Sequence, residues 1–292
     1  MEISTLSIAP RFEIKDDRFD VANLASYELY IELSGDRLRF TVFNSINQTF
    51  IWLEDYHIYT PFKESQFVEG LKRVYKEHAF LSANFWKSIT FSINSPYFTL
   101  VPSAYFTEEN VSKILDFAVG KSLSDSSEII DYPHAKFEFV NVFSIDKSWF
   151  SWINDAYPSR KVTLVHTIST LIEGITREKE FNGLHLYFEG IDISIIYFKD
   201  KKLQYCNRFQ YRTAQDLLYY ILFVINELNM PDDVKITFYG EITSFSENFL
   251  EISKYLQNLH FASTPNAIKF SMYFDEVPEH RYYSLFSGVH TE

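Results

Sequence analysis

The chain has 292 residues, of which 46% are apolar and 18% aromatic, and its formal net charge is −12. This composition excludes a disordered chain, and the length suits two domains of about 100–150 residues each. The acidity argues against a nucleic-acid partner, because binding to phosphates requires clustered Lys and Arg.

Three simple features indicate the compartment. Cys206 is the single cysteine, which excludes a disulfide within the chain and fits a reducing compartment. Its place in a predicted strand favours a buried, inert thiol. The N-terminal residues lack the basic and apolar regions of a signal peptide, and the longest apolar run, Leu217–Ile225, is shorter than the roughly 20 residues that a membrane helix needs. We therefore expect a cytoplasmic protein with no membrane partner.

The first half of the chain is expected to begin with a surface arm over residues 1–26, with one short strand at Thr5–Ile8. From Tyr27 onward apolar and polar residues alternate, which predicts three antiparallel strands joined by turns at Ser34–Asp36 and Asn44–Gln48. The further elements expected here are a helix over Glu64–His78, strands over Trp86–Ile93 and Tyr97–Pro102, a helix over Thr107–Phe117, a strand over Lys136–Phe143, a short helix over Lys147–Asn154 and a longer helix over Lys161–Glu178.

The pattern of Tyr27–Tyr56 returns at Asn182–Tyr211 without a gap, with Gly35 aligned to Gly190, 155 residues further on. The elements expected after this point are strands over Leu184–Glu189, Ile191–Phe198 and Leu203–Tyr211, a helix over Ala214–Asn229, a strand over Val234–Tyr239, a helix over Ser246–Leu256, a strand over Ala267–Phe274 and a closing helix over Glu279–Phe286.

Each half therefore has the predicted order βββαβαβα. This order predicts an α/β fold with mixed five-stranded sheets and helices on their faces. We expect an N-terminal lobe over residues 1–160 and a C-terminal lobe over residues 161–292.

A duplicated βββαβαβα unit resembles the ribonuclease H-like, actin-like ATPase fold. More specifically, the chain is similar to a bacterial family known only as a domain of unknown function, family 3822. The resemblance lies in LYIELSGDRLRFTVFN (29–44), FTLVPSAYFTEENVSKIL (98–115), YRTAQDLLYYILFVINEL (211–228) and SKYLQNLHFASTPNAIKFSMYFDEVPEHRYYSLF (253–286). None of these stretches is a catalytic signature, so the resemblance implies a fold and not an activity.

In active members of the superfamily, two Asp-x-Gly turns hold the phosphates of ATP between the lobes. Here the first Asp and Gly positions fall on Glu32 and Ser34, with Gly35 displaced by one residue. The second pair falls on Tyr187 and Glu189, where a carboxylate would repel phosphate. A third turn, normally Gly-Gly, is Tyr239-Gly240-Glu241. The candidate nucleotide-contacting residues in the cleft-facing turns are therefore Glu32, Ser34, Gly35, Glu189, Gly190 and Gly240.

Because all three turns depart from the motif, we expect no cofactor and no catalytic residue. The preferred hypothesis is a non-catalytic scaffold or binding protein whose partner is another protein or a second copy of the chain. The alternative is a protein that binds ATP with Mg²⁺ through divergent turns.

A weaker alternative is a metal-dependent nuclease. Its carboxylates would be Glu32, Asp36, Glu189, Asp192 and Glu241. The simpler interpretation is that Asp36, Glu189 and Asp192 are ordinary turn residues and that Glu32 lies on a solvated strand face. The histidines show no metal-binding spacing, so no metal site is predicted.

Aromatic residues supply the last set of expectations. Tyr219, Tyr220 and Phe223 lie on a helix that is apolar all round, which favours burial. The candidates for an exposed aromatic patch that binds a protein partner are Trp149, Trp152, Tyr157, Tyr282 and Tyr283.

Overall fold

The computed structural model describes residues 9–58, 64–123, 125–134, 136–158, 160–264 and 268–290. The strand predicted at Thr5–Ile8 lies outside these residues. The chain forms two compact units. Unit 1 comprises Met1–Thr170, Asn266–Glu276 and Gly288–Glu292, and unit 2 comprises Leu171–Pro265 and Val277–Ser287. The lobes predicted over residues 1–160 and 161–292 stay a prediction.

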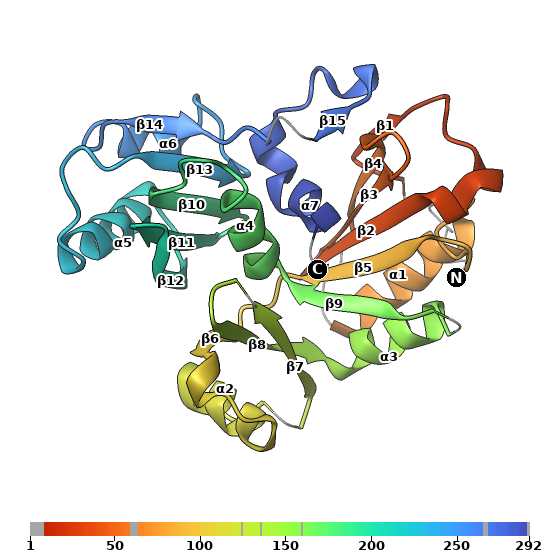
Figure 1. Ribbon diagram of the computed structural model, residues 1–292, viewed down its shortest axis with the longest axis horizontal. Coiled ribbons are helices and arrows are strands. Elements are labelled where there is room, and N and C mark those ends of the chain that lie inside the picture. The colour runs from red at the N-terminus through yellow and green to blue at the C-terminus, as the bar shows by residue number, and fades with distance from the viewer. Residues whose placement is uncertain are drawn as a thin grey trace, which may run out of the picture. The chain divides into compact units, whose positions relative to one another are not determined.

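The main sheet of unit 1 has the strand order β1-β4-β3-β2-β5-β9, with β15 beside β4 (Figure 1). Its central strand β2 pairs antiparallel with β3 and parallel with β5. The strands are β1 (Phe12–Lys15), β2 (Tyr27–Ser34), β3 (Arg37–Asn44), β4 (Thr49–His57), β5 (Ser88–Ile93), β9 (Val162–His166) and β15 (Lys269–Phe270).

Two helices cover one face of this sheet, α1 (Glu64–Glu77) and α3 (Lys147–Ala156). Alternate residues of β2, such as Leu29, Ile31 and Leu33, point into the core that these helices close. Every second residue of β2 therefore shares one core with Phe67 and Leu71, which lie four residues apart on one side of α1, as the sequence predicts.

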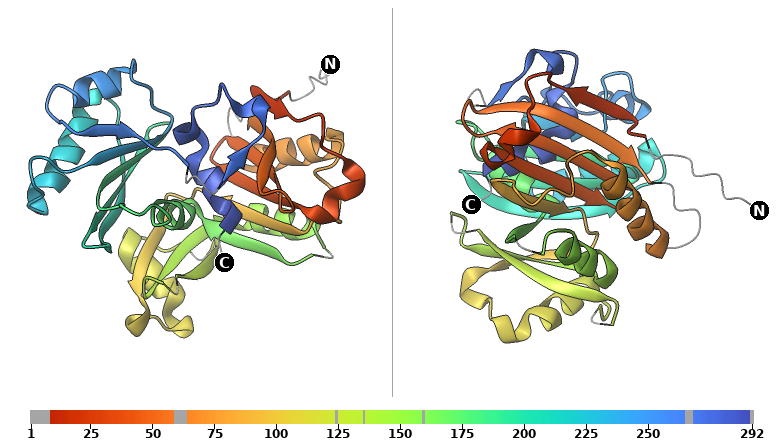
Figure 2. Two further views of the ribbon diagram at one scale, coloured as in Figure 1. Left: turned by 45° about the horizontal axis from the view of Figure 1, so that its top comes forward. Right: turned by 90° about the vertical axis from the view of Figure 1, so that its right-hand side faces the viewer.

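A separate three-stranded sheet is inserted between β5 and α3. Its order is β6-β8-β7, and its elements are β6 (Phe98–Pro102), α2 (Val111–Val119), β7 (Ser127–His134) and β8 (Phe139–Asp146). It has a small core of its own, formed by Val101, Leu115, Val140 and their neighbours. Figure 2 shows this sheet, yellow to green, as a layer apart from the main sheet of unit 1.

The insertion corrects part of the predicted order. The strand expected over Lys136–Phe143 belongs to the inserted sheet and not to the main one. The fifth strand of the repeat is β9, which lies where a helix over Lys161–Glu178 was expected. The β-branched run Val162-Thr163 at its start favours a strand, and helix α4 begins only at Thr167 and ends at Ile175.

Unit 2 contains one five-stranded sheet of order β12-β11-β10-β13-β14. Its strands are β10 (Gly183–Glu189), β11 (Asp192–Lys199), β12 (Lys202–Gln210), β13 (Ile236–Gly240) and β14 (Leu259–Phe261), and its helices include α5 (Ala214–Glu227), α6 (Glu247–Ile252) and α7 (Tyr283–Ser287). The strand predicted over Ala267–Phe274 is wrong for this sheet, because β14 takes the fifth position and Lys269–Phe270 pairs with β4 in unit 1. Ala267 itself lies outside the described residues.

The two units share one strand order. In unit 1 the repeat is β4-β3-β2-β5-β9, and in unit 2 it is β12-β11-β10-β13-β14. In both, an antiparallel three-strand meander is followed by two parallel strands. The topology thus confirms the predicted duplication of a mixed α/β unit. The main sheet of unit 1 differs in having two additional strands, β1 and β15, beside β4.

Candidate functional site

The first predicted turn joins β2 to β3 and contains Ser34 and Gly35. Glu32 lies two residues before it, on the sheet face opposite the core, and is 1% exposed. The Nη1 atom of Arg39 lies 3.0 Å from Oε1 of Glu32, and its Nε lies 3.5 Å from a carboxylate oxygen of Asp55. The expectation of a solvated Glu32 is therefore wrong, because this carboxylate is part of a buried ion-pair network.

The second predicted turn and the third lie side by side in unit 2. Gly190, at φ +58°, turns β10 into β11, and Gly240, at φ +81°, ends the neighbouring strand β13. A Cβ at Gly240 would approach the carbonyl oxygen of Phe188 to 2.1 Å, so this position requires glycine. Glu189, Gly190 and Gly240 are thus brought together at the carboxyl ends of β10 and β13.

Charges around this second turn compensate one another. The hydroxyl of Tyr187 donates to Glu189 at 3.2 Å, and Nε of Arg208 donates to Ser194 at 3.1 Å. Burial raises the pKa of Asp192, and the nearby Arg208 only partly offsets this rise. Burial lowers the pKa of Arg208, because it disfavours the charged guanidinium. A cation therefore already lies among the carboxylates that a nucleotide would have to approach.

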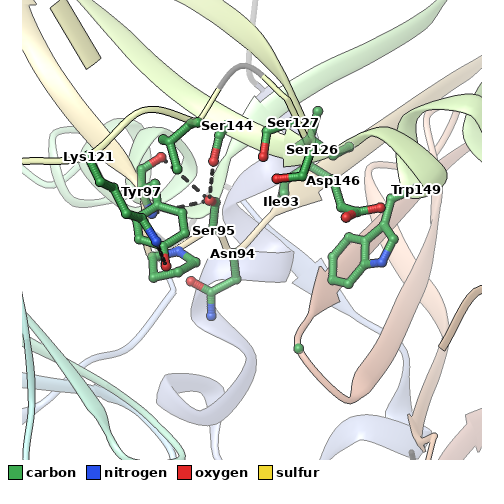
Figure 3. A pocket seen from close by; sticks show the side chains of 14 residues that line it. Ile93, Asn94, Ser95, Tyr97, Lys121, Ser126, Ser127, Ser144, Asp146 and Trp149 are labelled. Atoms are coloured by element: carbon green, nitrogen blue, oxygen red, sulfur yellow. Dashed lines mark hydrogen bonds between the residues drawn. The ribbon is translucent and has the colours of Figure 1, made fainter. Parts of the chain in front are cut away.

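A pocket of about 390 Å³ lies within unit 1 and was not predicted as a site (Figure 3). It opens at the carboxyl ends of the parallel strands β2 and β5, where α/β sheets commonly bind ligands. The residues that line it are Gly35, Ile93, Asn94, Ser95, Pro96, Tyr97, Lys121, Leu123, Ser126, Ser127, Ser144, Ile145, Asp146 and Trp149. Of these residues, Gly35 was a predicted nucleotide-contacting residue and Trp149 a candidate for a partner-binding aromatic patch. The other walls come from the inserted sheet and the segments around it.

The middle of the pocket is lined by hydroxyl groups. The Oγ atoms of Ser95 and Ser144 lie 3.3 Å apart, and Ser95 Oγ accepts a hydrogen bond from the backbone N–H of Tyr97 at 3.2 Å. Behind this wall, Nε2 of the buried His166 lies 2.9 Å from the carbonyl oxygen of Ser95. His166 thereby fixes the loop after β5 to the end of β9, so the hydroxyls are held in place.

The two ends of the pocket carry opposite charges (Figure 3). At one end the Lys121 ammonium lies 3.8 Å from the centre of the Tyr97 ring, a cation–π arrangement. At the other end Asp146 caps α3 by accepting from the backbone N–H of Ser148 at 2.7 Å, and Trp149 forms the adjacent wall. The indole Nε1 of Trp149 is buried and has no hydrogen-bond partner within the described part of the chain. The pocket offers hydrogen bonds and apolar walls.

Other chemistries find less support. No three His, Cys, Asp or Glu side chains among the described residues are grouped so that they could hold a metal ion. Burial raises the pKa of Cys206 to about 12, so its sulfur stays a thiol at neutral pH. Within the same described ranges, every helix is too short or too polar to cross a bilayer.

The predictions for the aromatic residues are mostly wrong. Tyr219 and Phe223, expected in the core, are 63% and 46% exposed. Four of the five aromatic residues considered for an exposed patch are buried, namely Trp152, Tyr157, Tyr282 and Tyr283. Tyr219 and Phe223 therefore form an exposed pair of aromatic residues on α5.

Comparison with known proteins agrees with the fold. Residues 16–259 match the family described as "Protein of unknown function (DUF3822)". A protein of Bacteroides thetaiotaomicron VPI-5482, described as having an actin-like ATPase fold and unknown function, is 23% identical and superimposes with a TM-score of 0.75 over 84% of this chain and 93% of that one. The predicted actin-like fold is confirmed. No functionally curated protein matches the sequence.

Two further structures illustrate what proteins of this fold do elsewhere. The PilM-PilN type IV pilus biogenesis complex is 8% identical with a TM-score of 0.52, over 89% of this chain and 96% of that one. The activator of the 2-hydroxyisocaproyl-CoA dehydratase from Clostridium difficile, solved with bound ADPNP, is 6% identical with a TM-score of 0.44, over 89% of this chain and 92% of that one. The first of these similarities agrees with the shared fold, and neither assigns an activity to this chain.

Proposed function

This chain belongs to the family described as a protein of unknown function (DUF3822), and from that premise we propose that it is a non-catalytic binding module that holds a short segment of a partner protein in the pocket of unit 1. We also propose a cytoplasmic location, since the one cysteine of the chain, Cys206, has no second cysteine with which to form a disulfide within the chain.

The observation that carries this proposal is the lining of the pocket. At about 390 Å³ it falls in the lower part of the range of about 300–1,000 Å³ typical of ligand sites, so it holds a few residues and not a domain. Hydroxyls run along its middle between the Lys121 end and the Asp146 end. Such a row of hydrogen-bonding groups suits the backbone of an extended peptide.

The charges favour a peptide over a nucleotide. A nucleotide needs several cations or backbone N–H groups for its phosphates, whereas this pocket has Lys121 at one end and the carboxylate of Asp146 at the other. A peptide with an acidic residue near Lys121 and an apolar residue against Trp149 would satisfy both ends. That a protein of this fold is solved within the PilM-PilN type IV pilus biogenesis complex is compatible with this proposal.

The test is to block the pocket and measure peptide binding. Random dodecapeptides displayed on phage are selected on the immobilised full chain, and the affinity of the selected peptides is measured by fluorescence anisotropy. Gly35→Trp places a bulky side chain at the pocket wall, where an added Cβ meets no atom within 4 Å. Asn47→Trp, in the exposed turn between β3 and β4, is the matched control.

We expect Gly35→Trp to weaken the selected peptides by about tenfold or more and Asn47→Trp to leave them unchanged. Equal binding to Gly35→Trp and to the unaltered protein would show that the peptides bind elsewhere, and the pocket proposal would then be wrong.

Binding of ATP with Mg²⁺ through Glu32, Ser34, Gly35, Glu189, Gly190 and Gly240 is a second candidate. It is favoured by the left-handed backbone of Gly190, where an added Cβ would meet no atom within 4 Å, which leaves room for a phosphate to approach main-chain N–H groups. It is opposed by the engagement of Glu32 with Arg39 and by the negative charge of Glu189. Calorimetry decides: micromolar binding of ATP that is lost in a folded Gly190→Trp variant would replace our first proposal with this one.

A further inference from the structure

Helix α5 has an exposed apolar stripe on the side away from its sheet. Its core side packs Leu217, Ile221 and Val224 against the strands of unit 2. On the outer side Tyr219 and Phe223 are 63% and 46% exposed, and their rings are stacked with centroids 6.2 Å apart. Leu222, 37% exposed, completes the stripe, which we call the α5 face.

The neighbouring helix α6 extends this surface. Its residues Ile252 and Phe249 pack into the same core as α5, so both helices lie on one face of the sheet and their outer sides point the same way. Leu250 of α6 is 51% exposed, and Phe245 just before it is 89% exposed. Clustered large apolar side chains on a surface indicate a site for another macromolecule, whereas single ones do not.

The charges around this surface have one dominant sign. From Arg212 to Lys254 the chain has seven acidic residues and three basic ones. The acidic residues are Asp216, Glu227, Asp232, Asp233, Glu241, Glu247 and Glu251. Lys254 is already engaged, since its ammonium lies 2.6 Å from Glu251. Acidic residues therefore outnumber basic ones along the segment that contains α5 and α6.

This excess of acidic residues favours some occupants of the α5 face over others. A second copy would bring the same acidic surroundings against themselves, and the chain as a whole carries a net charge of −12. An anionic lipid surface would be repelled for the same reason. A cationic, amphipathic partner is favoured, because its apolar side covers the aromatic rings while its Lys and Arg face the carboxylates.

We propose that the α5 face docks a basic amphipathic helix of a partner protein. The apolar side of that helix packs against Tyr219, Leu222 and Phe223, which act as anchors at the centre of the contact. Its cations pair with acidic residues at the ends of α5, such as Glu227. This surface belongs to unit 2 and is independent of the pocket in unit 1.

The probe is an amidated octadecapeptide of leucine and lysine, with leucines at helical spacing on one side, and a second peptide in which glutamate replaces lysine. Binding to the full chain is measured by calorimetry at low and at physiological salt. The test variant is the double substitution Tyr219→Ser with Phe223→Ser, which changes exposed side chains only. Phe117→Ser, at an aromatic ring 90% exposed on α2 of unit 1, is the matched control.

We expect the lysine peptide to bind the unaltered protein and the Phe117→Ser variant with equal affinity, and the double variant at least about tenfold more weakly. Each of the three proteins should bind the lysine peptide more tightly than the glutamate peptide. Equal binding to all three proteins would mean that the attraction is only the general negative charge, and the proposal would fail. Self-association in ultracentrifugation, or co-sedimentation with phosphatidylglycerol vesicles, that disappears in the double variant would likewise overturn it in favour of a second copy or a membrane.

Discussion

The carboxylate of Glu32 and the guanidinium of Arg39 lie 3.0 Å apart on neighbouring strands of unit 1, and both side chains are almost fully buried. Glu32 is the residue that the sequence predicts at the Asp position of the first phosphate turn. Removing one partner of a buried ion pair leaves the other charge without that compensation, which typically costs about 3–5 kcal/mol.

For this pair we expect Arg39→Met to reduce the free energy of unfolding by about 3–5 kcal/mol, because it removes the buried cation that both Glu32 and Asp55 contact. Glu32→Gln should cost less, about 1–3 kcal/mol, since Arg39 keeps its contact with Asp55. Urea unfolding followed by circular dichroism measures both. A loss below about 1 kcal/mol for Arg39→Met would contradict the assignment of a structural ion pair.

A second buried carboxylate, Glu54 on β4, should make unit 1 sensitive to acid. Its Oε1 accepts from the indole N–H of Trp52 at 2.9 Å, and its Oε2 lies 3.3 Å from Nε2 of His78. Burial alone would raise the pKa of Glu54, but hydrogen bonds from His78 and Tyr56 outweigh it and hold that pKa below the ordinary 4.5.

A carboxyl group with a lowered pKa in the folded state stabilises the protein above its unfolded pKa, and this contribution is lost as the pH falls further. We therefore expect the stability of the unaltered protein to fall more steeply below pH 4.5 than that of Glu54→Gln. Urea midpoints between pH 3 and pH 6 provide the comparison. If the urea midpoints of the two proteins changed equally with pH, the assignment of this acid sensitivity to Glu54 would be wrong.

His185 in unit 2 should make the stability of the protein depend on pH in a separate, higher range. Its Nε2–H donates to the carbonyl of Phe181 at 2.8 Å, and its Nδ1 accepts from the hydroxyl of Tyr239 at 2.9 Å, which fits the neutral ring. Burial lowers the pKa of His185 from 6.5 to about 4.

Between these two values the unfolded chain binds a proton at His185 and the folded chain does not, so stability declines as the pH falls from 6.5 to about 4. The full loss amounts to about 3 kcal/mol. We expect His185→Gln, which is less stable at pH 7, to lack this decline. If the variant and the unaltered protein lose equal stability over this range, His185 is protonated in the folded protein.

Sequence patterns were sufficient for the repeated hairpins and not for what surrounds them. The alternation around Gly35 and Gly190 defines both meanders, because one face of each strand must be apolar. The partner of Glu32 could also have been found, since a two-residue turn at Gly35-Asp36 places Arg39 directly opposite. The pocket could not, because its walls come from four separate stretches of the chain, at residues 35, 93–97, 121–127 and 144–149, and their proximity depends on the inserted sheet.

The boundary between a strand and a helix was predicted wrongly where no turn residue separates the two elements. Strand β9 runs into α4 at His166-Thr167 without Gly or Pro, so the whole stretch read as a helix. On α5 the apolar residues surround the helix, and periodicity alone could not show that Leu217, Ile221 and Val224 form the buried side. The exposure of Tyr219 and Phe223, on which the α5 face rests, is therefore a finding of the structure.

Gly240 and Gly190 provide a matched pair that separates backbone crowding from backbone strain. Both have positive φ, +81° and +58°, but a Cβ at Gly240 would lie 2.1 Å from the carbonyl oxygen of Phe188, whereas at Gly190 it would meet no atom within 4 Å. Gly190→Ala should thus cost about 1–2 kcal/mol for the left-handed conformation alone. Gly240→Ala should cost at least about 2 kcal/mol more, because β10 and β13 must also separate. Thermal and urea unfolding of the two variants give the difference, and equal losses would indicate that the β10–β13 contact yields without penalty.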